Sequence, residues 1–148
     1  MNMGGFGEML PAKENRCELD PQVKDAWGIP VLRIHCEHGD NEKAMIADIV
    51  EQSKQMLEAA GATDITIRDT PAAPGFGIHE VGTARMGNDP KTSVLNKWNQ
   101  AHDVKNLFVM DGSAFVSGAC QNPTLTMLAL TSRSCDYLVN EAKKGNLT

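Results

Sequence analysis

The sequence predicts an α+β protein in which short extended segments come first and two helical stretches follow. Residues 1–39 contain short apolar runs broken by glycine and proline, a pattern typical of strands joined by turns. We expect these segments to form an antiparallel sheet. Residues 42–60 and 123–143 carry apolar side chains at the spacing of a helix face, and suitable capping residues precede both stretches.

Runs of β-favouring residues predict the strands of the first half of the chain. They lie at 6–10, 16–19, 31–37 and 65–68. The run at 16–19 is expected to end before Pro21. Asp40 or Asn41 can cap the helix that follows these strands, because both side chains accept hydrogen bonds from first-turn amides. Gly61 is a natural stop for that helix.

A long loop, a strand and a closing helix are predicted for the second half. Residues 71–75 and 76–106 are predicted loops, and a long irregular stretch in a compact domain is often functional. Residues 107–110 predict a short apolar strand. Asn122 is a favoured N-cap and Pro123 a favoured first residue for the closing helix. We expect that helix to bury seven side chains: Leu125, Leu128, Ala129, Cys135, Leu138, Val139 and Ala142.

Composition excludes several classes of function. The chain has 148 residues, enough for one domain, and 41% of them are hydrophobic. A formal net charge of −5 without any basic block argues against nucleic acid or an anionic membrane as partner. No apolar run approaches the roughly 18 residues that span a bilayer, so we expect a soluble protein without a membrane segment. The N-terminus lacks the pattern of a secretory signal, and the cellular location stays open.

Cysteine and histidine spacing does not predict a metal site. The four cysteines are widely spaced without a CxxC pair, so we expect reduced thiols. His35, Cys36 and His38 are close in sequence, but alternate residues of a strand face opposite sides. No further cluster completes a tetrahedral ligand set, so we expect no metal. GxGxxG and P-loop motifs are also absent, so the chain carries no dinucleotide fingerprint of its own.

Two polar residues are candidates for chemistry. His79 lies among Gly75, Gly77 and Gly82, which let backbone approach another group closely, and histidine moves protons near neutral pH. Asn122 stands at a helix mouth, which carries partial positive charge and unpaired donors and is suited to an anion. From spacing alone, the simpler interpretation is a loop histidine bonded to backbone and an asparagine that only caps the helix.

Three segments, taken in order, resemble the C-terminal part of the glucose–methanol–choline (GMC) family of flavin-dependent oxidoreductases. The first is His-Glu-Val-Gly-Thr at 79–83 with Arg-Met-Gly at 85–87. The second is Asn-Leu-Phe-Val-Met-Asp-Gly-Ser at 106–113, and the third is Asn-Pro-Thr-Leu-Thr at 122–126. Short segments within 15–30 also resemble strands of the family's substrate domain, so the resemblance covers nearly the whole chain.

The resemblance implies an enzyme, a FAD-dependent dehydrogenase or oxidase acting on CH–OH groups of sugar, polyol or aldonate-like alcohols. In such an enzyme His79 would take the hydroxyl proton as base, and Asn122 would hydrogen-bond the same oxygen while hydride passes to flavin N5. By the same match, Asp111 and Gly112 would contact the cofactor near its ribityl–pyrophosphate portion. The match of the third segment implies that Pro123 lies near the flavin N1–C2 carbonyl.

Thr124 shares that implied position near N1–C2, at the mouth of the helix. The resemblance also implies a division of the chain into substrate-domain sheet and helix over about 1–75, then catalytic loop, flavin-domain strand and terminal helix over about 76–148. The family's FAD-binding βαβ unit lies in a missing N-terminal region, the implied partner of this fragment. We therefore expect the isolated fragment to be inactive and not to retain FAD. The alternative is a non-catalytic binding or assembly module of the same family.

Overall fold

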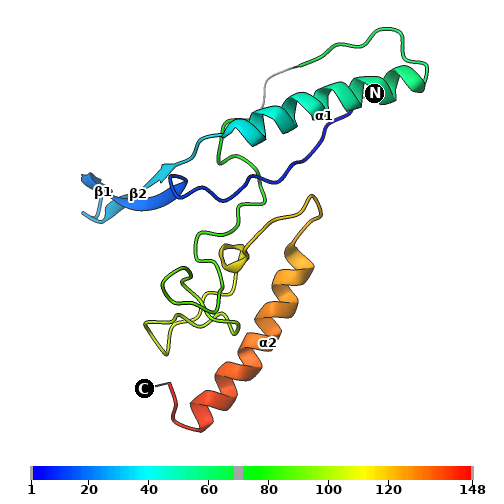
Figure 1. Ribbon diagram of the computed structural model, residues 1–148. Helices are drawn as coiled ribbons and strands as arrows, with labels where there is room; N and C mark the ends of the chain where they lie inside the picture. The colour runs from blue at the N-terminus through cyan, green and yellow to red at the C-terminus, as the bar shows by residue number, and fades with distance from the viewer. Residues whose placement is uncertain (1, 69–71, 148) are drawn as a thin grey trace. The chain divides into compact units, whose positions relative to one another are not determined.

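A computed structural model describes residues 2–68 and 72–147, so Pro71, in the predicted loop over 71–75, lies outside the described residues. The chain divides into two compact units between Gly77 and Ile78 (Figure 1). The first unit holds strands β1 (Arg16–Lys24) and β2 (Pro30–His35) and helix α1 (Asp40–Ala59). The second holds the short helix η1 (Gly112–Ala114) and helix α2 (Thr124–Lys143). Two antiparallel strands and two long helices confirm the predicted α+β class.

The strands β1 and β2 form an antiparallel pair in which Leu19 lies opposite Leu32. Strand β1 runs past the predicted end before Pro21, and its register shifts between Leu19 and Lys24. The shift is stabilised by Asp20, whose Oδ1 accepts the amide hydrogens of Gln22 and Val23 at 2.8 and 2.9 Å. A side chain therefore replaces the missing ladder partner, and the strand continues through the proline.

The two faces of this sheet differ in chemistry. One face holds charged side chains: Arg16, Glu18, Asp20, Arg33 and His35. The other face presents apolar side chains that are more than half exposed, at Leu19, Leu32 and Ile34. None of the four cysteines, all of which lie in the described residues, forms a disulfide in this structure.

The predicted strands at 6–10 and 65–68 are wrong, because neither segment is a strand in the described residues. A β-favouring run becomes a strand only where another backbone pairs with it. Instead, the N-terminal arm (residues 2–10) lies along α1 (Figure 1). The amide of Leu10 donates to Glu42 Oε1 at 2.9 Å, and a Cβ added at Gly5 would lie 2.5 Å from Ile49 Cγ2.

Helix α1 confirms the predicted helix at 42–60, but its N-cap is Gly39 rather than Asp40 or Asn41. The cap needs no side chain at that position because Glu42, three residues later, accepts the Gly39 amide hydrogen at Oε2, 2.8 Å away. Gly61 ends the helix as predicted, with a left-handed φ of +86° that glycine adopts without steric cost.

The second unit has a small core of buried side chains, Leu95, Ala101 and Ala114. The predicted strand at 107–110 is wrong. Among the described residues, this segment forms only an isolated bridge, between Gln100 and Phe108. It pairs with residues 99–101 on one side and with no continuous strand in the part of the chain that the structure describes.

Helix α2 confirms the predicted helix at 123–143, but not the face expected to be buried. Leu125, Leu128 and Val139 are 79%, 62% and 47% exposed. Ala129, Cys135 and Ala142 are also exposed, and Leu138 is half-buried. The helix is held by a different stripe, in which Ser134 is fully buried and the Thr131 hydroxyl donates to Met110 O at 3.1 Å. No helix in the described residues is long and apolar enough to span a membrane.

Candidate functional site

Gly112, in the second motif segment, lies against residues of the first segment and against Met127, the residue that follows the third segment. A Cβ added there would lie 2.8 Å from Met127 Cε, 3.3 Å from Glu80 O and 3.5 Å from Val81 Cγ1. Glu80 and Val81 follow His79 in the first segment, and Met127 lies in the first turns of α2. Only glycine leaves room for these three neighbours, so close packing at a buried residue joins these parts of the chain.

Backbone hydrogen bonds hold the histidine segment along η1. The amide of Ala84 donates to Ser113 O at 3.0 Å, and the amide of Met86 donates to Ala114 O at 2.9 Å. Gly82 has a left-handed φ of +89°, which turns the chain between His79 and these bonds. The loop that carries His79 is therefore fixed on the element that carries Gly112.

Asp111 caps η1 with its side chain. Its Oδ1 accepts the amide hydrogen of Ser113 at 2.8 Å and also the Ser113 hydroxyl hydrogen. Asp111 is exposed and Gly112 is buried. The resemblance implies that Asp111 and Gly112 contact the cofactor, and the structure shows that they close the turn after residue 110.

His79 is half-buried and lies in an unusual turn. Ile78, the residue before it, has a left-handed φ of +57°. The Ile78 amide donates to Glu80 Oε1 at 2.9 Å, so the side chain of the next residue closes the turn around His79. Sequence reasoning missed both Ile78 and Glu80, because no propensity rule places an isoleucine in this conformation.

The mouth of α2 differs from the predicted cap. Helix α2 begins at Thr124, and Pro123 occupies the N-cap position that was predicted for Asn122. The Pro123 backbone is already helical, with φ −86° and ψ −8°, so its carbonyl accepts the first helical bond, from the Met127 amide at 3.0 Å. Asn122 is exposed just before the helix, and no side-chain hydrogen bond caps this end.

This arrangement leaves a set of hydrogen-bond donors at the mouth of α2. The first-turn amides have no side-chain cap, and the first turn holds no acidic residue. A helix of 20 residues adds the partial positive charge of its dipole at that end. Donors in a first turn that carries no carboxylate of its own suit a group with partial negative charge.

The contacts at Gly112 bring together neighbours of the predicted site residues. Asp111 and Gly112 are joined directly through η1. Glu80 and Val81 lie just after His79 and contact the site of a Gly112 Cβ, as does Met127 from the helix that begins with Thr124. Asn122 and Pro123 precede that helix directly. The predicted residues therefore belong to one connected part of the second unit.

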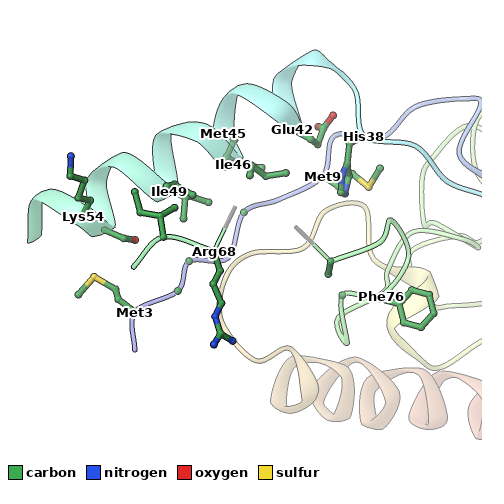
Figure 2. Close-up of a pocket in the computed structure, with 18 of the residues that line it drawn as sticks. Met3, Met9, His38, Glu42, Met45, Ile46, Ile49, Lys54, Arg68 and Phe76 are labelled. Atoms are coloured by element: carbon green, nitrogen blue, oxygen red, sulfur yellow. The ribbon is translucent and has the colours of Figure 1, made fainter. Parts of the chain in front are cut away.

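Neither of two cavities is lined by the predicted site residues. The first unit holds a cavity of about 510 Å³ between α1 and the N-terminal arm (Figure 2). Its apolar lining includes Met3, Met9, Met45, Ile46, Ile49 and Phe76. The second unit holds a cavity of about 320 Å³, whose lining includes Met86, Lys97 and Arg133. Within the described residues, no group of three or more His, Cys, Asp or Glu could hold a metal ion.

Comparison with known proteins identifies relatives along most of the chain. A sequence model of the family described as GMC oxidoreductase matches residues 11–131. The chain is 42% identical over 136 residues to 2-methyl-1,2-propanediol dehydrogenase of Mycolicibacterium austroafricanum, which covers 90% of this chain and 24% of the relative.

Two sugar-related enzymes are also similar. Identity is 34% over 140 residues to the fructose dehydrogenase large subunit of Gluconobacter japonicus, covering 93% of this chain and 25% of the relative. Identity is 34% over 144 residues to the gluconate 2-dehydrogenase flavoprotein of Pantoea cypripedii, covering 88% and 22%. The chain spans about a quarter of the length of these curated relatives.

Proposed function

The chain belongs to the GMC oxidoreductase family, and from this premise we propose that it is the C-terminal catalytic portion of a FAD-dependent oxidoreductase acting on CH–OH groups. The observation that carries the proposal is the close packing at Gly112 of the first two motif segments and the first turns of α2. Segments that are distant in sequence but share one buried contact can act on one ligand. The remainder of the flavoprotein, including the FAD-binding unit, is the partner that this proposal requires.

We assign the proton transfer to His79. Its imidazole takes the hydroxyl proton of the alcohol, and the side-chain amide of Asn122 donates a hydrogen bond to the same oxygen. Histidine is the usual proton acceptor near neutral pH, whereas an amide does not titrate, so the two side chains divide deprotonation and orientation between them. FAD, where bound, supplies the two-electron acceptor.

We assign cofactor contacts to the elements that flank these side chains. Asp111 and Gly112 lie toward the ribityl–pyrophosphate portion, and the backbone at Pro123 and Thr124 lies toward the N1–C2 carbonyl region. The uncapped start of α2 supports the second assignment, because its donors favour negative charge beside them.

The substrate class is a small polyhydroxylated alcohol, sugar or aldonate. The names of similar proteins support this class, since they include a propanediol dehydrogenase, a fructose dehydrogenase and a gluconate dehydrogenase. Others are named as oxidases, such as paromamine 6'-oxidase of Streptomyces fradiae, so both oxygen and other electron acceptors need to be tested. A substrate panel on the full-length protein, with oxygen and an artificial acceptor, identifies both the substrate and the electron acceptor.

The decisive variant is His79→Ala in the full-length flavoprotein. We expect anaerobic flavin reduction by substrate to slow by about 10²-fold or more, the usual scale of general acid–base catalysis. His102→Ala is the matched control, because His102 is a histidine of the same unit that bonds Ser93 Oγ and Gly87 O. An unchanged rate in His79→Ala would remove His79 from this role.

A further inference from the structure

The turn that carries His79 holds its backbone in a conformation that costs energy. Ile78 has a φ of +57°, a region that β-branched residues rarely adopt because Cβ approaches the carbonyl oxygen. The Ile78 side chain is 78% exposed, so core packing does not impose this conformation. Strained residues of this kind persist where surrounding contacts hold them, and they cluster at functional sites.

Glu80 supplies the contacts that hold this turn. Its carboxylate Oε1 accepts the Ile78 amide hydrogen at 2.9 Å, which closes the turn on both sides of His79. Its main-chain oxygen lies 3.3 Å from the position of a Cβ at Gly112, so the same residue rests against η1. Glu80 therefore connects the conformation of Ile78 to the element that carries Asp111 and Gly112.

We propose that Glu80 is a positioning residue for His79, which acts by holding the Ile78 amide and so fixing the backbone that carries the imidazole. This inference rests on the proposed function of His79 as the base. Glu80 takes no proton and touches no substrate in this role. What the turn requires of Glu80 is an oxygen acceptor at the Oε1 position.

The first test compares Glu80→Ala with Glu80→Gln in the full-length flavoprotein. Loss of the acceptor in Glu80→Ala should slow flavin reduction by about 10- to 100-fold with little change in KM, because small displacements of a reacting group have costs of this order. Glu80→Gln keeps an oxygen in place and should restore most of the rate. Asp89→Ala is the matched control, since Asp89 Oδ1 also accepts a nearby amide, that of Lys91, at 2.9 Å. Equal losses in Glu80→Ala and Glu80→Gln would overturn the proposal.

A double-variant cycle separates this inference from the assignment of His79. If Glu80 acts through His79, Glu80→Ala should have no further effect on flavin reduction in a His79→Ala background. An additional loss there would show that Glu80 acts by another route. If His79→Ala alone has the wild-type rate, the proposed function fails; if His79→Ala is slow and Glu80→Ala is not, only the positioning role fails.

Two further measurements address the turn itself. Hydrogen exchange of the peptide that covers residues 76–84 should be faster in Glu80→Ala than in Glu80→Gln, with or without substrate. Glycine adopts positive φ without cost, so Ile78→Gly should reduce the loss caused by Glu80→Ala. Equal exchange in the two Glu80 variants, or an undiminished loss in Ile78→Gly, would contradict the mechanism.

Discussion

The hydroxyl of Ser134 donates a 2.9 Å hydrogen bond to Oδ1 of Asn99, and the two residues are 0% and 1% exposed. Asn99 also bonds twice to Val109, through its main-chain oxygen at 2.9 Å and its side-chain nitrogen at 3.0 Å. One buried asparagine therefore ties helix α2 to the segment that leads into Asp111.

Removing the hydroxyl of Ser134 should destabilise the second unit. Ser134→Ala leaves Asn99 Oδ1 buried without this donor, and we expect the free energy of unfolding to fall by about 1–3 kcal/mol. Urea denaturation measures the change. Ser132→Ala, an exposed serine on the same helix, should lie within about 0.5 kcal/mol of wild type. Similar stability of the two variants would show that the buried bond is not needed.

Adding a methyl group at Gly112 should push the motif segments apart. In Gly112→Ala the terminal methyl of Met127 can move, but the main-chain oxygen of Glu80 at 3.3 Å cannot move without the loop. We expect a loss of about 1–3 kcal/mol of stability, the usual cost of overpacking, together with slower flavin reduction in the full-length protein. Gly4→Ala is the control, since a Cβ there meets nothing within 4 Å. Unaltered stability in Gly112→Ala would mean that the segments are not tightly packed.

Removing the carboxylate of Glu42 should release the N-terminal arm from α1. Glu42→Ala loses the 2.9 Å bond from the Leu10 amide and the 2.8 Å bond from the Gly39 amide. Limited proteolysis should therefore cut within residues 2–10 faster than in wild type. Glu51→Ala, which removes an exposed carboxylate from the same helix, should leave the cleavage rate unchanged. If both variants are cut at the wild-type rate, Glu42 does not hold the arm.

Asp20 should make stability depend on pH in acid. Hydrogen bonds from the Val23 and Gln22 amides, with Arg33 beside them, hold the pKa of Asp20 below its ordinary value of 3.8. Because the folded pKa is lower than the unfolded one, the stabilisation is complete above 3.8 and is lost as pH falls through the folded pKa.

Asp20→Asn tests this dependence. The variant should be less stable than wild type at neutral pH and should lose less stability below about pH 4. Arg33→Gln should keep part of the acid dependence, because the bonds from the Val23 and Gln22 amides, the two largest causes of the lowered pKa of Asp20, remain. Thermal unfolding between neutral pH and pH 2 measures both. A wild-type acid dependence in Asp20→Asn would exclude Asp20 as its source.

The isolated chain should not retain FAD. The GxGxxG fingerprint that binds a dinucleotide is absent, and the chain spans about a quarter of its relatives. We expect flavin absorbance to disappear from the purified chain on dialysis. A protein that stays yellow would show that the residues at the mouth of α2 and around Gly112 bind the cofactor unaided.

Helices were predicted well because their signal is local. Apolar spacing and the stop at Gly61 lie within the same stretch of sequence as the helix that they define. Strand 6–10 failed because pairing depends on a distant segment, and Glu42 took the Leu10 amide instead. The buried face predicted for α2 was wrong because Leu125 and Leu128 are exposed and a serine, Ser134, is the fully buried residue of this helix.

The candidate site was predictable as a set of segments, through resemblance to a family. Its internal geometry was not. No sequence rule predicts that Gly112 lies against Glu80, because 32 positions separate them and the contact depends on the whole second unit. The left-handed conformation of Ile78 was not predictable either, because backbone propensity opposes it and the Glu80 hydrogen bond that supports it is not visible in the sequence.

The hydrogen bonds that cap η1 determine which carboxylate oxygen of Asp111 is available to a ligand. Both described bonds from Ser113 end on Oδ1, so an approaching hydroxyl hydrogen is left with Oδ2 as its acceptor. The turn, and not free rotation of the carboxylate, sets the direction of that acceptor. In Asp111→Asn the amide oxygen would keep the bonds from Ser113, and the NH₂ group would take the place of Oδ2. This nearly isosteric change would replace a hydrogen-bond acceptor with a donor at the position that faces a ligand.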